Sequence, residues 1–430
     1  MTSLINNQKS NQSIQNYIPI VGNIHTKKPL AYQVTRGFIP IANSIQMALT
    51  ESYINGLEVP DSVLRSFFDT CMPVIFKHFP AFLTPYDWVL EETPHLAEGS
   101  QELMKTQYNL PQGMLNRMIG DSPVIYPKYS MGLWERGATT LEQSQMHMID
   151  DVIEKMGIQD GDNILDFGCG WGCVPNYILS KFPNVTFTGL NLSHEQCEYM
   201  RHKMQDPASY LSSGRFTLVE DDLNTVTFAE KFDKILSIGV FCHVGSLTHA
   251  FKKLASFLKP NGKCFIHIIT VRLPNNISSA FTHKYIFPHG RYWKYDAIPE
   301  HNQDLKTVER WYLSGKNYAK TIECWTENFD RSYDEIKDLS YGMDFLKFRR
   351  IWRFYLIWFL SNFSSCDGEI NGNGQYLMVH AGWLGLNLLG FAVVGEGIAD
   401  GLDFAVGEVE VEDAIVAVAV FAKMVGAVLT

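Results

Sequence analysis

Apolar and polar positions divide the chain into a helical first part and an alternating second part. Between residues 41 and 128 apolar side chains recur at helical spacing, as at Val63 and Phe67, and this spacing predicts helices. Within that part, residues 111–127 contain prolines and are typical of a loop with a short helix. Residues 1–40 show no such spacing, and we expect a flexible leader there.

From residue 140 to residue 269 short apolar runs alternate with amphipathic stretches. The runs predicted to form strands cover residues 163–167, 185–190, 215–219, 234–238 and 262–269. The stretches predicted to be helical cover residues 140–156, 175–181, 193–204 and 247–258. Strands and helices that alternate at this interval form a parallel sheet with helices on both faces, so the pattern predicts an α/β fold.

Two changes of character follow the alternating part. Residues 274–381 are dense in aromatic side chains and include a predicted helix, residues 345–360, whose side chains are apolar, aromatic or basic. Residues 382–430 combine many Gly, Ala and Val residues with acids and show weak periodicity. We therefore expect the folded domain to occupy residues 129–381, and the last segment to be an appendage that is either disordered or a sequence artefact.

Composition supports a globular protein with a sizeable core, because 46% of the residues are hydrophobic and 19% are charged. The formal net charge is -10, which provides no basic surface of the kind that nucleic acid requires, and we expect no nucleic-acid partner. Aromatic residues make up 13% of the chain. That fraction fits either a well-packed core or a site for an apolar or cationic ligand.

Several features of the chain indicate a cytoplasmic protein. Residues 1–13 are polar and lack the apolar stretch of a signal peptide. The eight cysteines contain no CxxC pair, as expected for reduced thiols, and Cys169 and Cys173 fit a glycine-rich loop better than a metal site. No uncharged apolar run reaches the roughly 18 residues of a membrane span. Basic side chains in residues 347–353 leave peripheral membrane contact open, although a solvated helix face is the commoner explanation.

A glycine-rich loop follows the strand predicted at residues 163–167. The string DFGCGWG at residues 166–172 places glycines where a backbone can turn with positive φ and let a ligand approach its N–H groups. A dinucleotide fingerprint differs, because its third glycine comes one position later and an acid follows the second strand. Here the second strand ends in Gly189, Leu190 and Asn191, so the loop argues against NAD.

The pattern D-x-G-C-G-x-G is the loop of class I S-adenosylmethionine-dependent methyltransferases, and the resemblance extends beyond it. Matching strings are YSMGLW at residues 129–134, TTLE at 139–142, GLNLSHEQ at 189–196, FCHVG at 241–245, KYIFP at 284–288 and WRF at 352–354. Together they resemble the family of cyclopropane-fatty-acid synthases and coclaurine N-methyltransferases over roughly residues 100–380. The resemblance implies a Rossmann-like fold with a mostly parallel seven-stranded sheet, and S-adenosyl-L-methionine as the cofactor.

The resemblance also implies which residues hold the cofactor. They are Tyr129, Ser130, Asp166, Gly168, Gly170, Gly172, Asn191, Gln196 and Asp221. The acid and glycines of the loop are expected to hold the methionine end of the cofactor, and the Tyr-Ser pair to close over its carboxylate. The side chains after the second strand are expected near the ribose, and the acid after the third strand beside the adenine. For any single polar residue the alternative is a side chain on a surface loop.

Methyl transfer from a sulfonium needs an acceptor with a free lone pair or a π bond, so an ammonium must first lose its proton. A histidine with a pKa near 6.5 can take that proton. His243 follows the strand predicted at residues 234–238, at the carboxyl edge where α/β sites form. We therefore predict His243 as the proton acceptor, the alternative being a packed histidine.

Cyclopropane synthases, which this chain resembles, use a Glu, a Cys, a His and a Tyr to hold a bicarbonate that removes a proton from a methylated carbocation. The His and the Tyr match His267 and Tyr318, and Ile269 also matches the family. Cys242 replaces the Glu and Met131 replaces the Cys, so carbon chemistry that needs bicarbonate is disfavoured. The plant N-methyltransferases that the chain resembles also have a Glu before that His, so Cys242 departs from both branches. His267 and Tyr318 stay catalytic candidates beside His243, and the thiol of Cys242 is expected only to pack.

Three hypotheses follow for the function. The first is N-methylation of a small amine, and the second is methyl or methylene transfer to the carbon of a lipid. The third is a degenerate protein that binds the cofactor without catalysis. Dense aromatic residues after residue 274 suit an amine and an acyl chain equally, and the sequence fixes neither the acceptor nor the oligomeric state.

Overall fold

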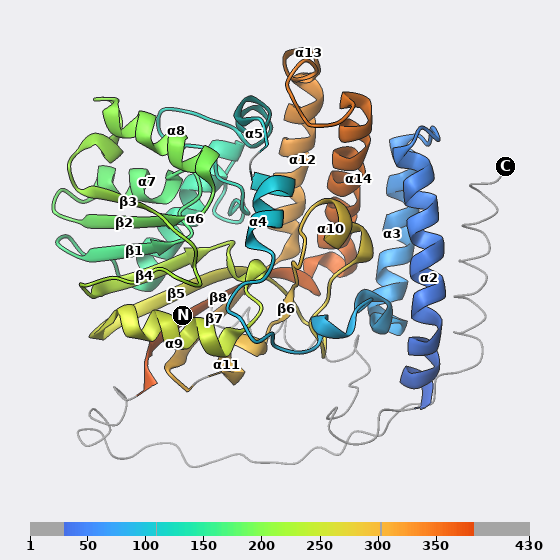
Figure 1. Cartoon of the computed structure of the whole chain (residues 1–430), viewed down its shortest axis with the longest axis horizontal. Helices are drawn as coiled ribbons and strands as arrows, with labels where there is room; N and C mark the ends of the chain where they lie inside the picture. The colour runs from blue at the N-terminus through green and yellow to red at the C-terminus, as the bar shows by residue number, and fades with distance from the viewer. Residues whose placement is uncertain (1–29, 109, 302, 382–430) are drawn as a thin grey trace.

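The computed structural model describes residues 30–108, 110–301 and 303–381, which surround one central sheet (Figure 1). The strand order is β3-β2-β1-β4-β5-β8-β7, and a short β6 pairs with β5. The strands are β1 (Asn163–Phe167), β2 (Thr186–Asn191), β3 (Phe216–Glu220), β4 (Phe232–Ile238), β5 (Leu258–Val271), β6 (Trp293–Lys294), β7 (Leu305–Leu313) and β8 (Asn371–His380). Strands β1 to β5 run parallel, and β8 is antiparallel to both neighbours. The predicted α/β fold with a mostly parallel seven-stranded sheet is confirmed, and the two-residue β6 is an addition.

Alternate side chains of the central strands enter two different hydrophobic clusters. Ile164 belongs to one cluster and its neighbour Leu165 to the other, because successive side chains of a strand point to opposite faces. The helices that pack on the sheet are α6 (Leu141–Met156), α7 (Cys173–Lys181), α8 (His194–Gln205) and α9 (Leu247–Phe257). Ile149 of α6 joins the first cluster and Phe251 of α9 the second, so both faces are covered, as predicted for a parallel sheet.

A helical layer lies beside the sheet and includes the N-terminal part of the described chain. Its long members are α2 (Leu30–Ile54), α3 (Asp61–His78), α12 (Gly315–Arg331) and α14 (Phe345–Ser364). Helices α12 and α14 contact β8, and α2 and α3 pack against α14 on the side away from the sheet (Figure 1). Shorter helices are α4 (Ser100–Leu103), α5 (Gln112–Ile119), α10 (Ala280–Tyr285), α11 (Ala297–Glu300) and α13 (Tyr333–Ile336).

The expected leader at residues 1–40 is wrong in its last part, because α2 begins at Leu30. Pro40 lies inside α2 and Ile39 is buried, so packing carries the helix past a residue type that normally interrupts one. Residues 1–29 and the predicted tail at residues 382–430 lie outside the described residues. In the part of the chain that the structure describes, no helix is both long enough and apolar enough to cross a membrane.

Residues 96–108, which we call the covering segment, cross the carboxyl ends of the parallel strands. The segment contains α4 and the π-helical turn η3 (Met104–Tyr108). Its start is anchored by a bridge between Ala97 and Val244, and by two hydrogen bonds between Ala97 and the side chain of Asn224. This crossing places the covering segment over the edge of the sheet where the glycine-rich loop lies.

Candidate active site

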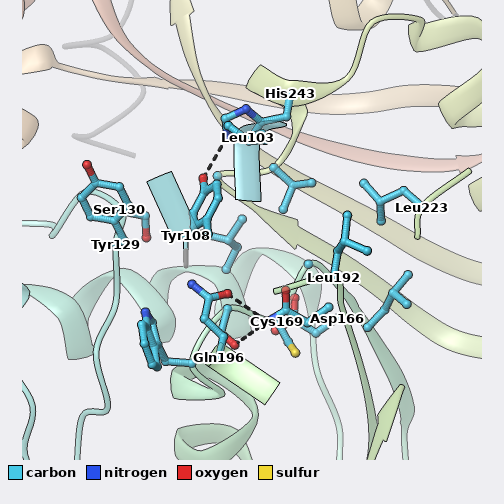
Figure 2. Close-up of a pocket in the computed structure, with 18 of the residues that line it drawn as sticks. Leu103, Tyr108, Tyr129, Ser130, Asp166, Cys169, Leu192, Gln196, Leu223 and His243 are labelled. Carbon is cyan, nitrogen blue, oxygen red and sulfur yellow. Dashed lines mark hydrogen bonds between the residues drawn. The ribbon is translucent and has the colours of Figure 1, made fainter. Parts of the chain in front are cut away.

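A pocket lies between the carboxyl edge of β1, β2 and β4 and the covering segment (Figure 2). Of the predicted site residues, those that line it are Tyr129, Ser130, Asp166, Gly168, Gly170, Asn191, Gln196 and His243. The structure therefore brings eight of the predicted residues to one cavity. Gly172, Asp221, His267 and Tyr318 lie outside its lining.

The three glycines of the loop have positive φ angles, but they differ in what surrounds them. A Cβ on Gly168 would lie 2.2 Å from Cγ2 of Val240, so that position has no room for a side chain. A Cβ on Gly170 would meet no described atom within 4 Å, because it would project into open space. Gly172 is the N-cap of α7, and a Cβ there would lie 3.0 Å from Leu211. Gly172 therefore serves packing, and Gly170 leaves space for a ligand.

Asp166 is the residue before the end of β1 and is only 2% exposed, although it lines the pocket. Burial raises the pKa of its carboxyl group to about 8. Among the described residues its side chain has no basic partner, and a buried carboxylate without a cation is costly. The carboxyl group thus fits a ligand that brings its own positive charge, such as the α-ammonium of a methionine moiety.

Asn191 and Gln196 form a small hydrogen-bonded unit where β2 ends and α8 begins. The amide of Asn191 donates to the carbonyl of Gly170 and to Oε1 of Gln196, both at 2.9 Å. Asp221 follows β3, and its backbone N–H donates to the carbonyl of Asn191 at 3.0 Å. Its carboxylate accepts from Asp222 N and from Thr225 Oγ1, so the side chain is held within its own turn. The expected contact of Asp221 with an adenine stays a prediction.

His243 lies in the 3-10 turn η5 (Phe241–His243) after β4 and lines the pocket. Its Nε2 is 2.8 Å from the hydroxyl of Tyr108, which the covering segment supplies (Figure 2). Burial lowers the pKa of His243 to about 4, well below the value near 6.5 assumed from the sequence. The imidazole is therefore neutral at neutral pH, and its Nδ1 is buried without a hydrogen-bond partner among the described residues.

Tyrosine side chains gather beside His243 and Cys242. We call Tyr108, Tyr129, Tyr292, Tyr318 and Tyr355 the tyrosine cluster. Burial raises the pKa values of Tyr108, Tyr292, Tyr318 and Tyr355, and charge on one phenol would raise those of its neighbours. The hydroxyls of Tyr129 and Tyr355 are 3.1 Å apart, and the ring of Tyr129 stacks on Trp325 at 5.1 Å. These contacts form a largely aromatic compartment next to the pocket.

Cys242 packs as predicted and does not have the character of a nucleophile. Its Sγ lies 3.4 Å from the carbonyl oxygen of Gly239. Burial raises the pKa of the thiol to about 12, so the thiolate is not populated at neutral pH.

His267 lies in the middle of β5 and is fully buried, away from the pocket lining. Its ring nitrogens lie 3.0 Å from the amide of Asn373 and 3.2 Å from that of Gln375, both on β8. Burial lowers the pKa of His267 to about 3. The structure therefore separates the two candidate histidines, since His243 faces the pocket and His267 joins two strands of the sheet.

Sequence reasoning missed two residues of this site. Tyr108 lies in a stretch whose spacing indicated only helix, and its partner His243 is 135 positions away. Lys128 lines the pocket directly before the Tyr129–Ser130 pair. The sole available signal was that the chain places a lysine next to the string YSMGLW.

Comparisons with known proteins agree with this geometry. A family model described as mycolic acid cyclopropane synthetase matches residues 98–371. (S)-coclaurine N-methyltransferase from Papaver somniferum is 28% identical over 299 residues, which cover 66% of this chain and 80% of the plant enzyme. Cyclopropane-fatty-acyl-phospholipid synthase from Escherichia coli (strain K12) is 29% identical over 256 residues, covering 59% of this chain and 62% of the bacterial enzyme. A solved coclaurine N-methyltransferase bound to N-methylheliamine and SAH aligns with a TM-score of 0.61 at 20% identity, over 81% of this chain and 98% of that one.

The matched region contains the whole pocket, apart from Ala97 at its edge. Asp166 without a cation, the open space at Gly170 and the Asn191–Gln196 unit all fit S-adenosylmethionine, which is the cofactor of this family. The chain belongs to the mycolic acid cyclopropane synthetase family, and it is an S-adenosylmethionine-dependent methyltransferase.

Proposed function

We propose that this methyltransferase transfers the methyl group to the nitrogen of a small amine. The observation that carries the proposal is the separation of the two histidines. His243 lines the pocket beside Tyr108, whereas both ring nitrogens of His267 are engaged by side chains of β8. With Cys242 in place of a Glu, the bicarbonate-binding set that carbon chemistry would use is incomplete at the pocket.

The residues of the pocket hold the two ends of the cofactor and leave its sulfonium to supply the methyl group. In this proposal Asp166 pairs with the α-ammonium and the backbone at Gly170 lies against the methionine end. Asn191 and Gln196 hold the ribose, and their mutual hydrogen bond orients both amides before the ligand arrives. Positioning of this kind is the main contribution that a protein makes to an in-line methyl transfer.

The state of His243 decides how the acceptor loses its proton. A histidine with a pKa of about 4 is a weak base, so it does not hold a proton taken from an ammonium group. Burial in the aromatic compartment also disfavours the charged form of an amine. In this mechanism the acceptor therefore enters as the neutral amine, and the Tyr108–His243 pair orients it by hydrogen bonding to its N–H.

The tyrosine cluster suits the charge that then forms. Methyl transfer moves the positive charge from sulfur to the acceptor nitrogen. Aromatic faces stabilise such a cation by about 2 kcal/mol where water is excluded. Tyr108 and Tyr129, which line the pocket, are the members of the cluster placed to contribute in this way, and Tyr318 packs behind them against Phe363 and Trp325.

Transfer to the carbon of a lipid is the second candidate function, because the family and the bacterial relative carry the names of cyclopropane synthases. An aromatic compartment can also surround an acyl chain. For either function we propose a protein of the cytoplasm. Whether it contacts a membrane depends on whether its acceptor is an amine or a lipid.

Incubation of the purified protein with methyl-labelled cofactor and a cell extract tests the proposal. Label should enter the amine fraction, and a Gly168→Val variant, which has no room for the side chain, serves as the inactive control. Label confined to the lipid fraction would put the second candidate first. Label in neither fraction, with cofactor still bound, would favour a binding protein without catalysis.

A further inference from the structure

Lys128 is a buried cation at the edge of the pocket. The residue is 5% exposed and lines the same cavity as Asp166. Its Nζ donates to the carbonyl oxygens of Met131 at 2.7 Å and Ser130 at 3.4 Å. Among the described residues it forms no ion pair with a carboxylate, and two carbonyl groups do not neutralise a buried charge.

The titratable groups that face Lys128 do not supply a negative charge. Cys173, from α7, is a thiol whose pKa burial raises to about 12. His267, from β5, is an imidazole whose pKa burial lowers to about 3. Both groups are neutral at neutral pH, and the pKa of Lys128 itself falls to about 7 because its ammonium is buried. An anion from outside the chain would restore its usual charge.

The start of α7 lies at the same part of the pocket. Its N-cap is Gly172, which provides no side-chain hydrogen bond to the first N–H groups of the helix. Cys173 and Val174, the first two residues of α7, line the pocket. Free N–H groups at a helix N-terminus, together with the helix dipole, favour an anion. Lys128 and α7 thus place positive charge on one side of the cavity.

Among the described residues that line the pocket, Lys128 and Asp166 are thus a buried cation and a buried acid without an ion pair, whereas Glu98, the other acid of the lining, is half-buried. A methionine moiety carries an α-carboxylate and an α-ammonium two bonds apart. We propose that Lys128 is a cofactor-binding residue whose ammonium receives the α-carboxylate of S-adenosylmethionine, while Asp166 receives the α-ammonium. The proposal rests on the cofactor and not on the identity of the acceptor, so it stands for an amine or a lipid substrate.

The test compares S-adenosylmethionine with decarboxylated S-adenosylmethionine, which lacks only the carboxylate, by calorimetric binding. Lys128→Gln keeps donors for the carbonyl groups of Ser130 and Met131 but removes the charge. This substitution should weaken the binding of S-adenosylmethionine by about 10- to 100-fold, the usual effect of losing a hydrogen bond to a charged group. Affinity for the decarboxylated compound should hardly change. Lys128→Arg should retain part of the preference for S-adenosylmethionine over the decarboxylated compound, because it retains the positive charge.

Lys253→Met serves as the matched control, since that lysine also donates to a backbone carbonyl but does not line the pocket. Equal losses for both ligands in Lys128→Gln would overturn the proposal and leave a lysine that only supports the loop. If Lys128→Gln does not fold, the affinities of Lys128→Arg and of the native protein for the two ligands test the proposal instead. Native protein that binds both ligands equally well also contradicts the proposal. So does a Lys128→Arg variant that folds but has lost all preference for the carboxylate.

Discussion

At the scale of single residues, Gly170 is the position of the loop where we propose that the cofactor lies against the backbone. A Cβ at this glycine meets no described atom within 4 Å, and its φ of 56° is in the left-handed region. Gly161 also has positive φ and open space, but it does not line the pocket. A substitution at either glycine therefore strains the backbone in the same way. Only a side chain at Gly170 would also occupy space in the pocket.

Gly170→Ala should abolish or strongly weaken binding of S-adenosylhomocysteine, whereas Gly161→Ala should bind as the native protein does. Each substitution should cost stability by about 1–2 kcal/mol, because a Cβ is disfavoured at positive φ. Calorimetric titration measures the binding and thermal melting the stability. Undiminished affinity in folded Gly170→Ala would move the cofactor away from this loop.

The pKa of His243 gives a second residue-scale prediction. With a folded pKa of about 4, His243 is already neutral above pH 5, so its titration should not appear in the working range. The rate should instead climb with pH as the acceptor amine loses its proton. His243→Ala should lower turnover by about 10²-fold and leave this climb in place, because the lost contact positions the acceptor.

Profiles of kcat/KM against pH for the native protein and His243→Ala provide the measurement. An inflection near pH 6.5 that disappears in the variant would show a histidine acting as the proton acceptor at its ordinary pKa. Tyr318→Phe, which keeps the aromatic ring, should stay within a few-fold of the native rate. A nearly silent His243→Ala combined with a crippled Tyr318→Phe would place the reaction at the residues of the lipid branch.

At the scale of elements, the pattern of apolar residues predicted strands β1 to β5 and missed β6, β7 and β8. Strands β1 to β5 are apolar runs that end in polar or glycine positions, and their bounds were predicted to within four residues. Strand β8 begins Asn-Gly-Asn-Gly, which is typical of a turn. Its glycines are needed because rings occupy the space of a side chain: a Cβ on Gly374 would lie 2.3 Å from the hydroxyl of Tyr376. Only the family resemblance predicted seven strands.

The residues of the site were likewise predicted only where a local motif contains them, and the covering segment contains no such motif. The motif residues of the glycine loop were found because their chemistry is local to one turn. Tyr108 contacts His243, and no pattern in the sequence indicates that a residue of a π-helical turn lies next to a residue after β4. Lys128 escaped notice because a single lysine carries meaning only once its burial is known.

The contact between Tyr108 and His243 predicts that the covering segment takes part in catalysis. Tyr108→Phe keeps the edge-on ring contact, whose centroids are 5.7 Å apart, and removes the hydroxyl. Turnover should fall about 10-fold with little change in cofactor affinity, since one hydrogen bond is lost. Phe287→Leu, which changes another ring beside His243, provides a control for packing. A Tyr108→Phe variant with native turnover and weaker cofactor binding would show that the covering segment helps to bind the cofactor and takes no part in catalysis.

At the scale of the whole molecule, the buried histidine of the sheet should make the protein sensitive to acid. The folded pKa of His267 is about 3, whereas an unfolded imidazole titrates near 6.5. The unfolded chain therefore binds the proton first, and stability should be lost as pH falls below 6.5. His267 should therefore lower the melting temperature by several degrees between pH 7 and pH 5; His243 acts in the same direction, and Asp166, whose folded pKa is about 8, acts in the opposite one.

His267→Gln should reduce this drop, because glutamine keeps a hydrogen bond to the amides of Asn373 and Gln375 and does not titrate. Melting curves of the two proteins over the same pH range measure the difference. Parallel curves would show that His267 does not govern the acid response.

Methyl transfer to nitrogen by this pocket can be checked by counting the deuterium atoms in the product. Purified protein is given cofactor with a trideuterated methyl group, together with an amine mixture and vesicles of unsaturated phospholipid. Transfer to nitrogen keeps all three deuterium atoms, whereas closure of a cyclopropane ring loses one of them. We predict an N-methylated amine, formed from an acceptor that carries an N–H, with three deuterium atoms, and no labelled ring in the lipid. A lipid product that carries two deuterium atoms would contradict the account.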